Sequence, residues 1–297
     1  MKRHFAMLAS VAAVCVPACA SAQDMKLPVM ENSVRFLVIG DAGTGDREQN
    51  EVAAQIVRWY NEFPFTFALM LGDNIYGKER PQDFARKFER PYKRLLDAGV
   101  KFHAALGNHD DPNQRYYKPF NLDGKRYRTF KEGNVRFFIL DSNYLDPEQV
   151  QWLEKELDDS ESEWKIVYFH HPLYTTARRG PEVELRAILE PTFVKHGVDV
   201  VFTGHEHIYE RFKPQRGIHH FVVGGGAKLR RGDTRRGPLT AAAFDRDRSF
   251  MIVAIVENKM FFQVVSRGGA VVDEGIITNR ETADATQAAV MPLVRSP

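Results

Sequence analysis

Cysteine is almost absent from this chain of 297 residues, which contains only Cys15 and Cys19. Both lie in an apolar run near the N-terminus that we expect to be removed from the mature protein. The remaining chain would then have no disulfide framework and no thiolate metal site. Its fold must be held by core packing, and any bound metal must use nitrogen and oxygen ligands.

Long hydrophobic runs are also missing. A membrane span needs about 20 apolar residues, and the longest run, residues 5–20, is shorter. It follows a basic start and ends in the small residues 20–22, a pattern typical of a cleaved export signal. We therefore predict a signal peptide over residues 1–22 and an exported protein, periplasmic or extracellular. A lipid anchor at Cys19 is an alternative, which Pro17 disfavours.

The chain has no marked excess of either charge. It contains 41 Lys and Arg residues against 39 Asp and Glu residues, and Lys2 and Arg3 of the predicted signal account for the difference. A neutral mature chain gives no support to binding of nucleic acid or of an anionic membrane. The most basic stretch, residues 228–236, is interrupted by Gly232 and Asp233 and is predicted to be a solvated loop. We expect a monomer with neither kind of partner.

Strand and helix patterns alternate through most of the chain. The predicted strands are 34–39, 66–71, 102–106, 135–140, 165–169 and 198–202, and the predicted helices are 47–60, 83–96 with a break at Pro91, 147–157 and 183–196. Later segments, 221–223, 250–256, 260–265 and 270–276, are all predicted strands. The pattern predicts one α/β domain over residues 23–277, with a sheet covered by helices on both sides and a second sheet built from the late strands. The small, polar residues 278–297 are predicted to form a flexible tail.

Polar side chains follow five of the predicted strands. These strand ends read Gly40-Asp41, Gly72-Asp73-Asn74, Gly107-Asn108-His109-Asp110, His170-His171 and Gly204-His205-Glu206-His207. In open α/β sheets, ligands bind just beyond the carboxyl ends of the strands. Four of the five ends have a glycine directly before the polar residue, which allows a sharp turn.

The side chains at these ends are typical metal ligands. They include the carboxylates of Asp41 and Asp73, the amide of Asn108 and the imidazoles of His170, His205 and His207. This mixture suits Zn, Mn, Fe or Ni and exceeds what one tetrahedral ion accepts. Two ions about 3.5–4 Å apart that share a carboxylate would use all six groups. Each residue alone has an ordinary structural explanation, but their coincidence at five strand ends predicts a binuclear site.

The ordered motifs resemble those of the calcineurin-like metallophosphoesterases and, within them, the purple acid phosphatases. That subfamily's pattern GDxG, GDxxY, GNH(D/E), VxxH and GHxH is found here at residues 40–43, 72–76, 107–110, 167–170 and 204–207. The resemblance extends over about residues 34–226, and the compact length is similar to the small, tartrate-resistant acid phosphatase class. It implies an α/β fold of two mixed β-sheets packed as a sandwich, with helices on both outer faces.

The resemblance also implies a ligand set. Fe(III) would be held by Asp41, Asp73, Tyr76 and His207, and Fe(II), Zn(II) or Mn(II) by Asp73, Asn108, His170 and His205. Asp73 would bridge the two ions, and a phenolate bond from Tyr76 to ferric iron would colour the protein. Tyr76 alone would read as a packing residue. The chain departs from some relatives because it lacks the cysteines for their disulfide.

The implied activity is hydrolysis of phosphomonoesters by a metal-activated hydroxide, as a metal-dependent acid phosphatase of broad specificity. His109 is the candidate catalytic acid, oriented by Asp110, and Asn108 and His109 are candidate contacts to substrate phosphate. His171 is a further candidate, although it reads equally as a packing residue. One of Arg178 and Arg179 is expected to contact substrate phosphate, and Arg179 is the one assigned, although both read equally as part of a solvated loop. One alternative is a phosphodiesterase acting on nucleotides or phospholipid headgroups. Another is a non-catalytic protein that binds metal or phosphate.

Overall fold

A computed structural model describes residues 27–280 of the chain. The predicted signal peptide, residues 1–22, lies outside this range, as does most of the predicted tail. Within residues 27–280, no helix combines the length and the hydropathy that crossing a membrane requires.

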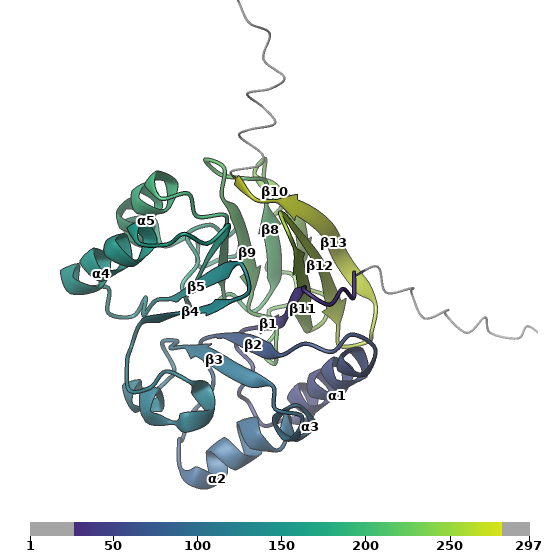
Figure 1. Ribbon diagram of the computed structural model, residues 1–297. Coiled ribbons are helices and arrows are strands. Elements are labelled where there is room, and N and C mark those ends of the chain that lie inside the picture. The colour runs from purple at the N-terminus through teal and green to yellow at the C-terminus, as the bar shows by residue number, and fades with distance from the viewer. Residues whose placement is uncertain (1–26, 281–297) are drawn as a thin grey trace, which may run out of the picture.

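Two mixed β-sheets pack face to face (Figure 1). The six-stranded sheet has the order β13-β12-β11-β1-β2-β3, and its strands are β1 (Val34–Ile39), β2 (Phe67–Leu71), β3 (Lys101–Ala105), β11 (Ser249–Val256), β12 (Lys259–Ser266) and β13 (Val271–Thr278). The seven-stranded sheet has the order β10-β8-β9-β7-β6-β5-β4, and its strands are β4 (Arg128–Glu132), β5 (Val135–Ile139), β6 (Trp164–Tyr168), β7 (Val200–Thr203), β8 (Tyr209–Phe212), β9 (His219–Val223) and β10 (Thr240–Phe244). Strands β1 to β3 are parallel, as are β5, β6, β7 and β9.

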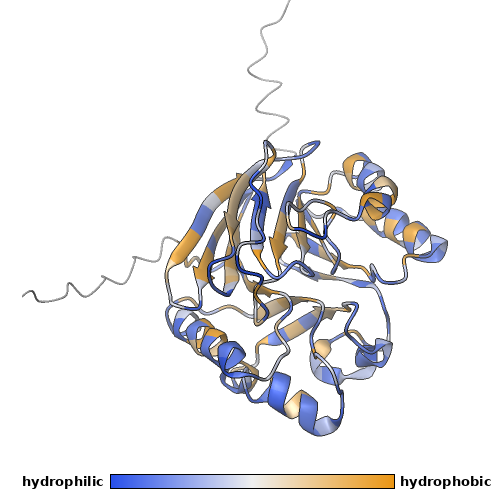
Figure 2. Ribbon diagram, turned by 180° about the vertical axis from the view of Figure 1, so that it is seen from behind, coloured by the Kyte–Doolittle hydropathy of each residue, from blue (hydrophilic) through white to orange (hydrophobic). Residues whose placement is uncertain are grey.

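Helices cover the outer faces of the sandwich. The helical segments are α1 (Arg47–Glu62), α2 (Pro81–Phe84), the π-helix η1 (Ala85–Glu89), α3 (Lys93–Asp97), the 3-10 turns η2 (Pro112–Tyr116) and η3 (Lys118–Phe120), α4 (Pro147–Asp158) and α5 (Val183–Lys195). Figure 1 shows α1 to α3 beside β1 to β3, and α4 and α5 beside the other sheet. The helices alternate polar and apolar residues whereas the strands are mostly apolar (Figure 2). The predicted fold class is confirmed, as is the helix break at Pro91, which lies between η1 and α3.

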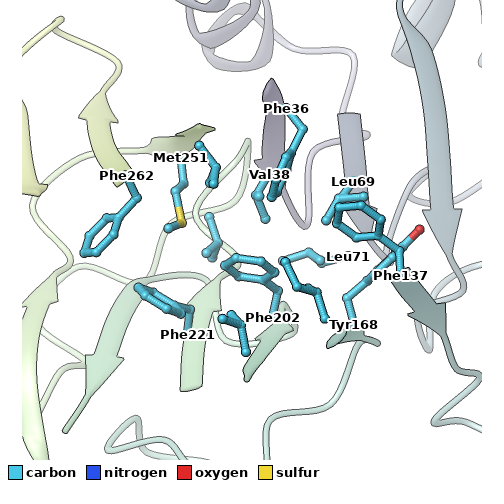
Figure 3. Close-up of a cluster of buried hydrophobic side chains, with 14 of the residues drawn as sticks. Phe36, Val38, Leu69, Leu71, Phe137, Tyr168, Phe202, Phe221, Met251 and Phe262 are labelled. Carbon is cyan, nitrogen blue, oxygen red and sulfur yellow. The ribbon is translucent and has the colours of Figure 1, made fainter. Parts of the chain in front are cut away.

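The main core fills the space between the sheets. Phe36 and Val38 of β1 point into it, while Leu37 and Ile39 of the same strand pack under the helices, as the two-residue repeat of a strand requires. The rings of Phe36 and Phe137, from opposite sheets, meet edge to face with centroids 5.4 Å apart (Figure 3). Burial on both faces explains why β1 reads as an apolar run from Phe36 to Ile39.

Three of the four late strands are not where the sequence places them. Segment 221–223 lies in β9 of the second sheet, as predicted, but β11 pairs antiparallel with β1 and brings β12 and β13 into the first sheet. The second sheet is built instead from the middle of the chain. The strands β4, β8 and β10 are absent from the sequence prediction, and β4 and β10 are edge strands whose side chains are largely part-exposed, which weakens their apolar pattern.

The chain is still packed where the sequence predicts the tail to begin. Strand β13 runs to Thr278, and Asn279 is buried. The backbone N–H of Asn279 donates to the Asn258 carbonyl at 3.0 Å, and that of Arg280 donates to Asp199 Oδ1 at 2.7 Å. The ordered domain therefore extends to at least Arg280.

A buried histidine in β3 is expected to make stability depend on pH. Both ring nitrogens of His103 lack a hydrogen-bond partner among the described residues, and its ring stacks on Phe130 with centroids 4.0 Å apart. Burial, aided by Arg128 and Lys101, lowers the pKa of His103 to about 3. Because a free histidine titrates near pH 6.5, the unfolded chain binds the extra proton first, and stability falls as the pH drops from about 6.5 toward 3.

Replacing this residue by phenylalanine keeps the stacked ring and removes the titration. We expect His103→Phe to recover about 2 kcal/mol of the stability that the wild type loses between about pH 7.5 and pH 5. Urea unfolding of both proteins at the two pH values measures this. Equal losses in both proteins would show that the histidine is not kept neutral.

Candidate metal centre

The five polar strand ends meet at one edge of the sandwich. Those after β1, β2 and β3 come from the first sheet, and those after β6 and β7 come from the second. Backbone bonds hold them in place: Gly204 N–H donates to the His170 carbonyl at 3.0 Å, and Gly40 N–H donates at 2.8 Å to the carbonyl of Val223, the last residue of β9. A Cβ at Gly72 would lie 2.6 Å from His170 Nδ1, so only glycine allows these ends to approach so closely.

One cluster of side chains contains two carboxylates, a phenol and an imidazole. Tyr76 Oη donates to Asp41 Oδ1 at 2.9 Å and lies 3.2 Å from His207 Nε2. Asp41, Asp73 and His207 each offer a ligand atom, and these atoms lie within 4.8 Å of one another. The four residues implied to hold the first ion are therefore brought together.

A second cluster lies beside the first. Asn108 Oδ1 is 3.0 Å from His170 Nε2 and 2.9 Å from His205 Nδ1, and the two ring nitrogens are 3.1 Å apart. Ligand atoms about 2.1 Å from a shared ion and at right angles around it have about this separation. Asp73 Oδ1 lies 3.4 Å from His170 Nε2 and so connects the two clusters.

Backbone groups fix the orientation of these side chains. His170 Nδ1 is 2.8 Å from the Leu71 carbonyl, which makes it the donor and leaves the lone pair of Nε2 facing the cluster. The N–H of His205 donates to Asp41 Oδ2 at 2.8 Å, and the N–H of His109 donates to Asp73 Oδ1 at 2.9 Å. Each carboxylate is thus held by the backbone of a different strand end.

Three of the clustered residues have unusual backbone angles. Asp41, Asp73 and His205 have φ values of 55°, 53° and 67°, in the left-handed region that favours glycine. Such conformations cost free energy and concentrate at functional sites, where the surrounding structure enforces them. Here they turn the chain sharply at the strand ends and aim the side chains at one another.

The buried acidic groups at the centre suit a bound cation. Asp41 and Asp73 are 0% and 1% exposed, and among the described residues their ion-pair partners are histidines alone. Burial, then the nearby Asp73, raises the pKa of Asp41 well above its usual value, and burial together with both aspartates raises the pKa of Tyr76. Burial lowers the pKa of His170 well below its usual value. Buried carboxylates need positive partners, and a neutral imidazole is a metal ligand, so these residues fit bound metal ions.

The candidate substrate residues surround this centre. His109 is exposed, with its ring 5.2 Å from that of Tyr76. The ring of His171 lies 4.6 Å from that of His205, and its Nδ1 is 2.8 Å from Ser142 Oγ. Arg179 Nη1 is 2.9 Å from His205 Nε2. The structure therefore places all three candidates at the centre.

Asp110 has a different role from the one predicted. Its carboxylate accepts the N–H groups of Gly107 and Ile75 at 2.8 and 3.1 Å, and the side-chain amides of Asn74 and Gln114 at 3.0 and 2.8 Å. The prediction that it orients His109 is wrong, because its oxygens brace the loops after β2 and β3 against each other. Burial, followed by the charge of Asp73, raises the pKa of Asp110 to about 7.

Part of the basic stretch 228–236 lies against the centre, whereas Arg231, Gly232, Arg235 and Arg236 are exposed, as the predicted solvated loop implies. The backbone N–H of Arg230 donates to the His207 carbonyl at 3.0 Å, and Lys228 Nζ lies 4.7 Å from the centroid of the Tyr76 ring. Asp233 Oδ1 accepts the backbone N–H of Arg178 at 3.2 Å, which ties this stretch to the loop that carries Arg179.

Sequence reasoning missed a sixth polar strand end. Asp141, Ser142 and Asn143 follow β5, and with Asn108, His171 and Glu182 they line a cleft of about 420 Å³ beside the centre. The signal that identified the other five strand ends, polar residues directly after a buried strand, also applies here.

The comparisons with known proteins agree with this geometry. The model of the calcineurin-like phosphoesterase family matches residues 34–209. Purple acid phosphatase 4 of Arabidopsis thaliana is 27% identical over 244 residues, which cover 69% of this chain and 71% of the relative. Tartrate-resistant acid phosphatase type 5 of Oryctolagus cuniculus is 26% identical over 239 residues, which cover 65% of this chain and 73% of the relative.

A solved structure shares the fold. The purple acid phosphatase PPD1 from seeds of yellow lupin (Lupinus luteus) aligns with a TM-score of 0.70 and 19% identity, covering 83% of this chain and 54% of that one. The family match spans more than half of this chain and contains all five strand ends that build the centre. The chain therefore belongs to the calcineurin-like phosphoesterase family, with purple acid phosphatases among its relatives, and is a metal-dependent phosphoric ester hydrolase.

Proposed function

We propose that this protein is a binuclear-metal acid phosphatase of broad specificity that hydrolyses small phosphomonoesters. The observation that carries the proposal is the pair of ligand clusters joined by Asp73, whose Oδ1 lies 3.4 Å from His170 Nε2. The names of the relatives, purple acid phosphatase and tartrate-resistant acid phosphatase, support a phosphatase that works in acid.

The two clusters differ in a way that suits different ions. We assign Fe(III) to the first, because two carboxylates and a phenol there can supply three negative charges. The second, with Asp73, Asn108, His170 and His205, would take Fe(II), Zn(II) or Mn(II). When bound, two such ions supply a hydroxide nucleophile near neutral pH and positive charge that stabilises the phosphoryl group during transfer.

The protein's own groups would bind the phosphate and protonate the leaving group. His109 stands exposed beside Tyr76 and is our candidate for the general acid. Ser142 Oγ accepts the backbone N–H of His171 at 3.2 Å, so its hydroxyl proton is free to be donated to His171 Nδ1 at 2.8 Å. This leaves the proton of the neutral imidazole on Nε2, and we propose that His171 donates it to a phosphate oxygen.

Metal analysis together with a paired ester assay tests the proposal. We expect about two equivalents of transition metal per chain and faster hydrolysis of p-nitrophenyl phosphate than of bis(p-nitrophenyl) phosphate. The reverse preference would favour a phosphodiesterase. A metal-loaded protein that binds phosphate but hydrolyses neither ester at any pH would favour a non-catalytic binding protein.

Tyr76 gives a spectroscopic prediction. With ferric iron in the first cluster, a phenolate–iron bond should give a visible absorption band, and Tyr76→Phe should abolish that band while the iron content stays above half of the wild-type value. The side chain is half-buried and the substitution removes one oxygen only, so we expect the domain to fold. A band of unchanged intensity in the variant would exclude Tyr76 as a ligand. Tyr116→Phe, at an exposed tyrosine, is the control.

A further inference from the structure

The contact between Arg179 and His205 determines which ring nitrogen of His205 carries the proton. A guanidinium group only donates hydrogen bonds, so His205 Nε2, 2.9 Å from Arg179 Nη1, must present its lone pair. The proton of the neutral imidazole then lies on Nδ1. An acceptor for this proton is present, because Asn108 Oδ1 is 2.9 Å from His205 Nδ1.

This tautomer is incompatible with a metal ion in the second cluster. His205 Nδ1 is the ring atom that faces the cluster, 2.9 Å from Asn108 Oδ1 and 3.1 Å from His170 Nε2. Binding an ion there requires the lone pair of Nδ1, so the proton must lie on Nε2. That N–H would then point at the guanidinium at 2.9 Å, which places two donors against each other.

We propose that Arg179 and the second metal ion compete for His205, so that metal binding releases the guanidinium to bind the phosphate of the substrate. In the exchange one proton leaves Nδ1 to solvent and another is taken up at Nε2, so the imidazole stays neutral. The identity of the ligand rests on the proposed phosphatase function. The competition itself does not, because it follows from the donors and acceptors of the two side chains.

The surroundings of Arg179 permit such a change of partner. Its side chain is exposed, whereas the loop below it is held by Thr175 Oγ1, which donates to Glu210 Oε2 at 2.7 Å, and by the backbone N–H of Arg178 on Asp233. Arg179 Nη1 also lies 3.5 Å from the His205 carbonyl, a contact that neither tautomer disturbs. The guanidinium therefore stays close to the centre after it leaves the ring, and its fork of N–H groups matches a phosphate.

Arg179→Gln tests the competition, because loss of this side chain should strengthen metal binding at the second cluster. Calorimetric titration of Zn²⁺ into chelator-treated protein should show the second equivalent binding about tenfold more tightly than in the wild type. Inorganic phosphate should bind the zinc-loaded variant about tenfold more weakly. The matched control is Arg178→Gln, which removes the same charge from the neighbouring exposed residue and should change neither constant.

The tautomer can be read directly from ¹⁵N shifts of the His205 ring. The metal-free wild type should carry its proton on Nδ1 and the zinc-loaded protein on Nε2, whereas metal-free Arg179→Gln should lose the preference for Nδ1. A proton on Nε2 in the metal-free wild type, or unchanged or weaker Zn²⁺ binding by Arg179→Gln, would overturn the proposal. Neither measurement needs turnover, so the competition and the phosphatase function can fail independently.

Discussion

Asp73→Asn is expected to reduce phosphomonoester hydrolysis at least about 10³-fold and to leave at most one equivalent of metal on the protein. Asp73 Oδ1 is the atom that connects the two ligand clusters, 3.4 Å from His170 Nε2. An amide oxygen binds a cation far more weakly than a carboxylate and does not bridge two ions readily. The loss should therefore appear in kcat and in metal content together, measured by steady-state kinetics and elemental analysis.

The fold should survive this substitution. Asparagine has the same shape, its amide oxygen can still accept the N–H of His109, and the change removes one of two buried like charges. The control is Asp273→Asn, which alters a carboxylate that pairs with Arg211 in β8 and belongs to neither ligand cluster, and it should keep wild-type activity. Two bound metal equivalents and more than a tenth of the activity in Asp73→Asn would contradict the assignment of a shared ligand.

Gly107→Ala is expected to disable the centre without changing any ligand. A Cβ at this position would lie 2.2 Å from the backbone nitrogen of Asp73 and 2.3 Å from its Oδ1. Because backbone atoms cannot yield as a flexible side chain can, the strand ends that carry Asp73 and Asn108 must separate. We expect activity to fall about 10²-fold or more and the free energy of unfolding to fall by about 1–3 kcal/mol.

A second glycine provides the comparison. Gly237 has open space where its Cβ would be, so Gly237→Ala should match the wild type in both activity and unfolding. Full activity in Gly107→Ala would mean that the two strand ends tolerate separation and that the spacing of the ligand clusters is not critical. The pair of variants thus measures the effect of the close approach of two strand ends, apart from the general effect of adding a methyl group.

The centre depends on contributions from both sheets. Asp41, Asp73 and Asn108 follow strands of the first sheet, and His170, His205 and His207 follow strands of the second. Backbone bonds such as that from Gly40 to Val223 cross between them. Slippage of one sheet against the other would separate the carboxylates from the imidazoles, so the aromatic core around Phe36 and Phe137 also holds the ligand clusters in position.

Local sequence was enough to predict the strands that carry the metal-ligand candidates and the polar ends of those strands. The run Val34–Ile39 is apolar apart from Arg35 and is followed by Gly40, and it forms a strand with those bounds. Asp46 and Asp146 each cap a helix by accepting an N–H three residues later. These features follow from interactions within a few residues, which is why the sequence determines them without knowledge of the rest of the chain.

Pairing between distant segments was decided by the tertiary structure alone. The late strand β11 pairs antiparallel with β1, more than 200 positions away in the sequence. Both strands are largely apolar, and no local pattern specifies that they pair with each other. Tertiary packing also decided the partners of Asp110, which accepts four hydrogen bonds from the loops around it. It likewise separated two neighbouring arginines: Arg179 contacts His205, whereas Arg178 faces Asp233. The sequence by itself determined which residues could bind metal; only the folded chain decided which atoms of those residues face one another, because hydrogen-bond direction and distance depend on the packing of both sheets.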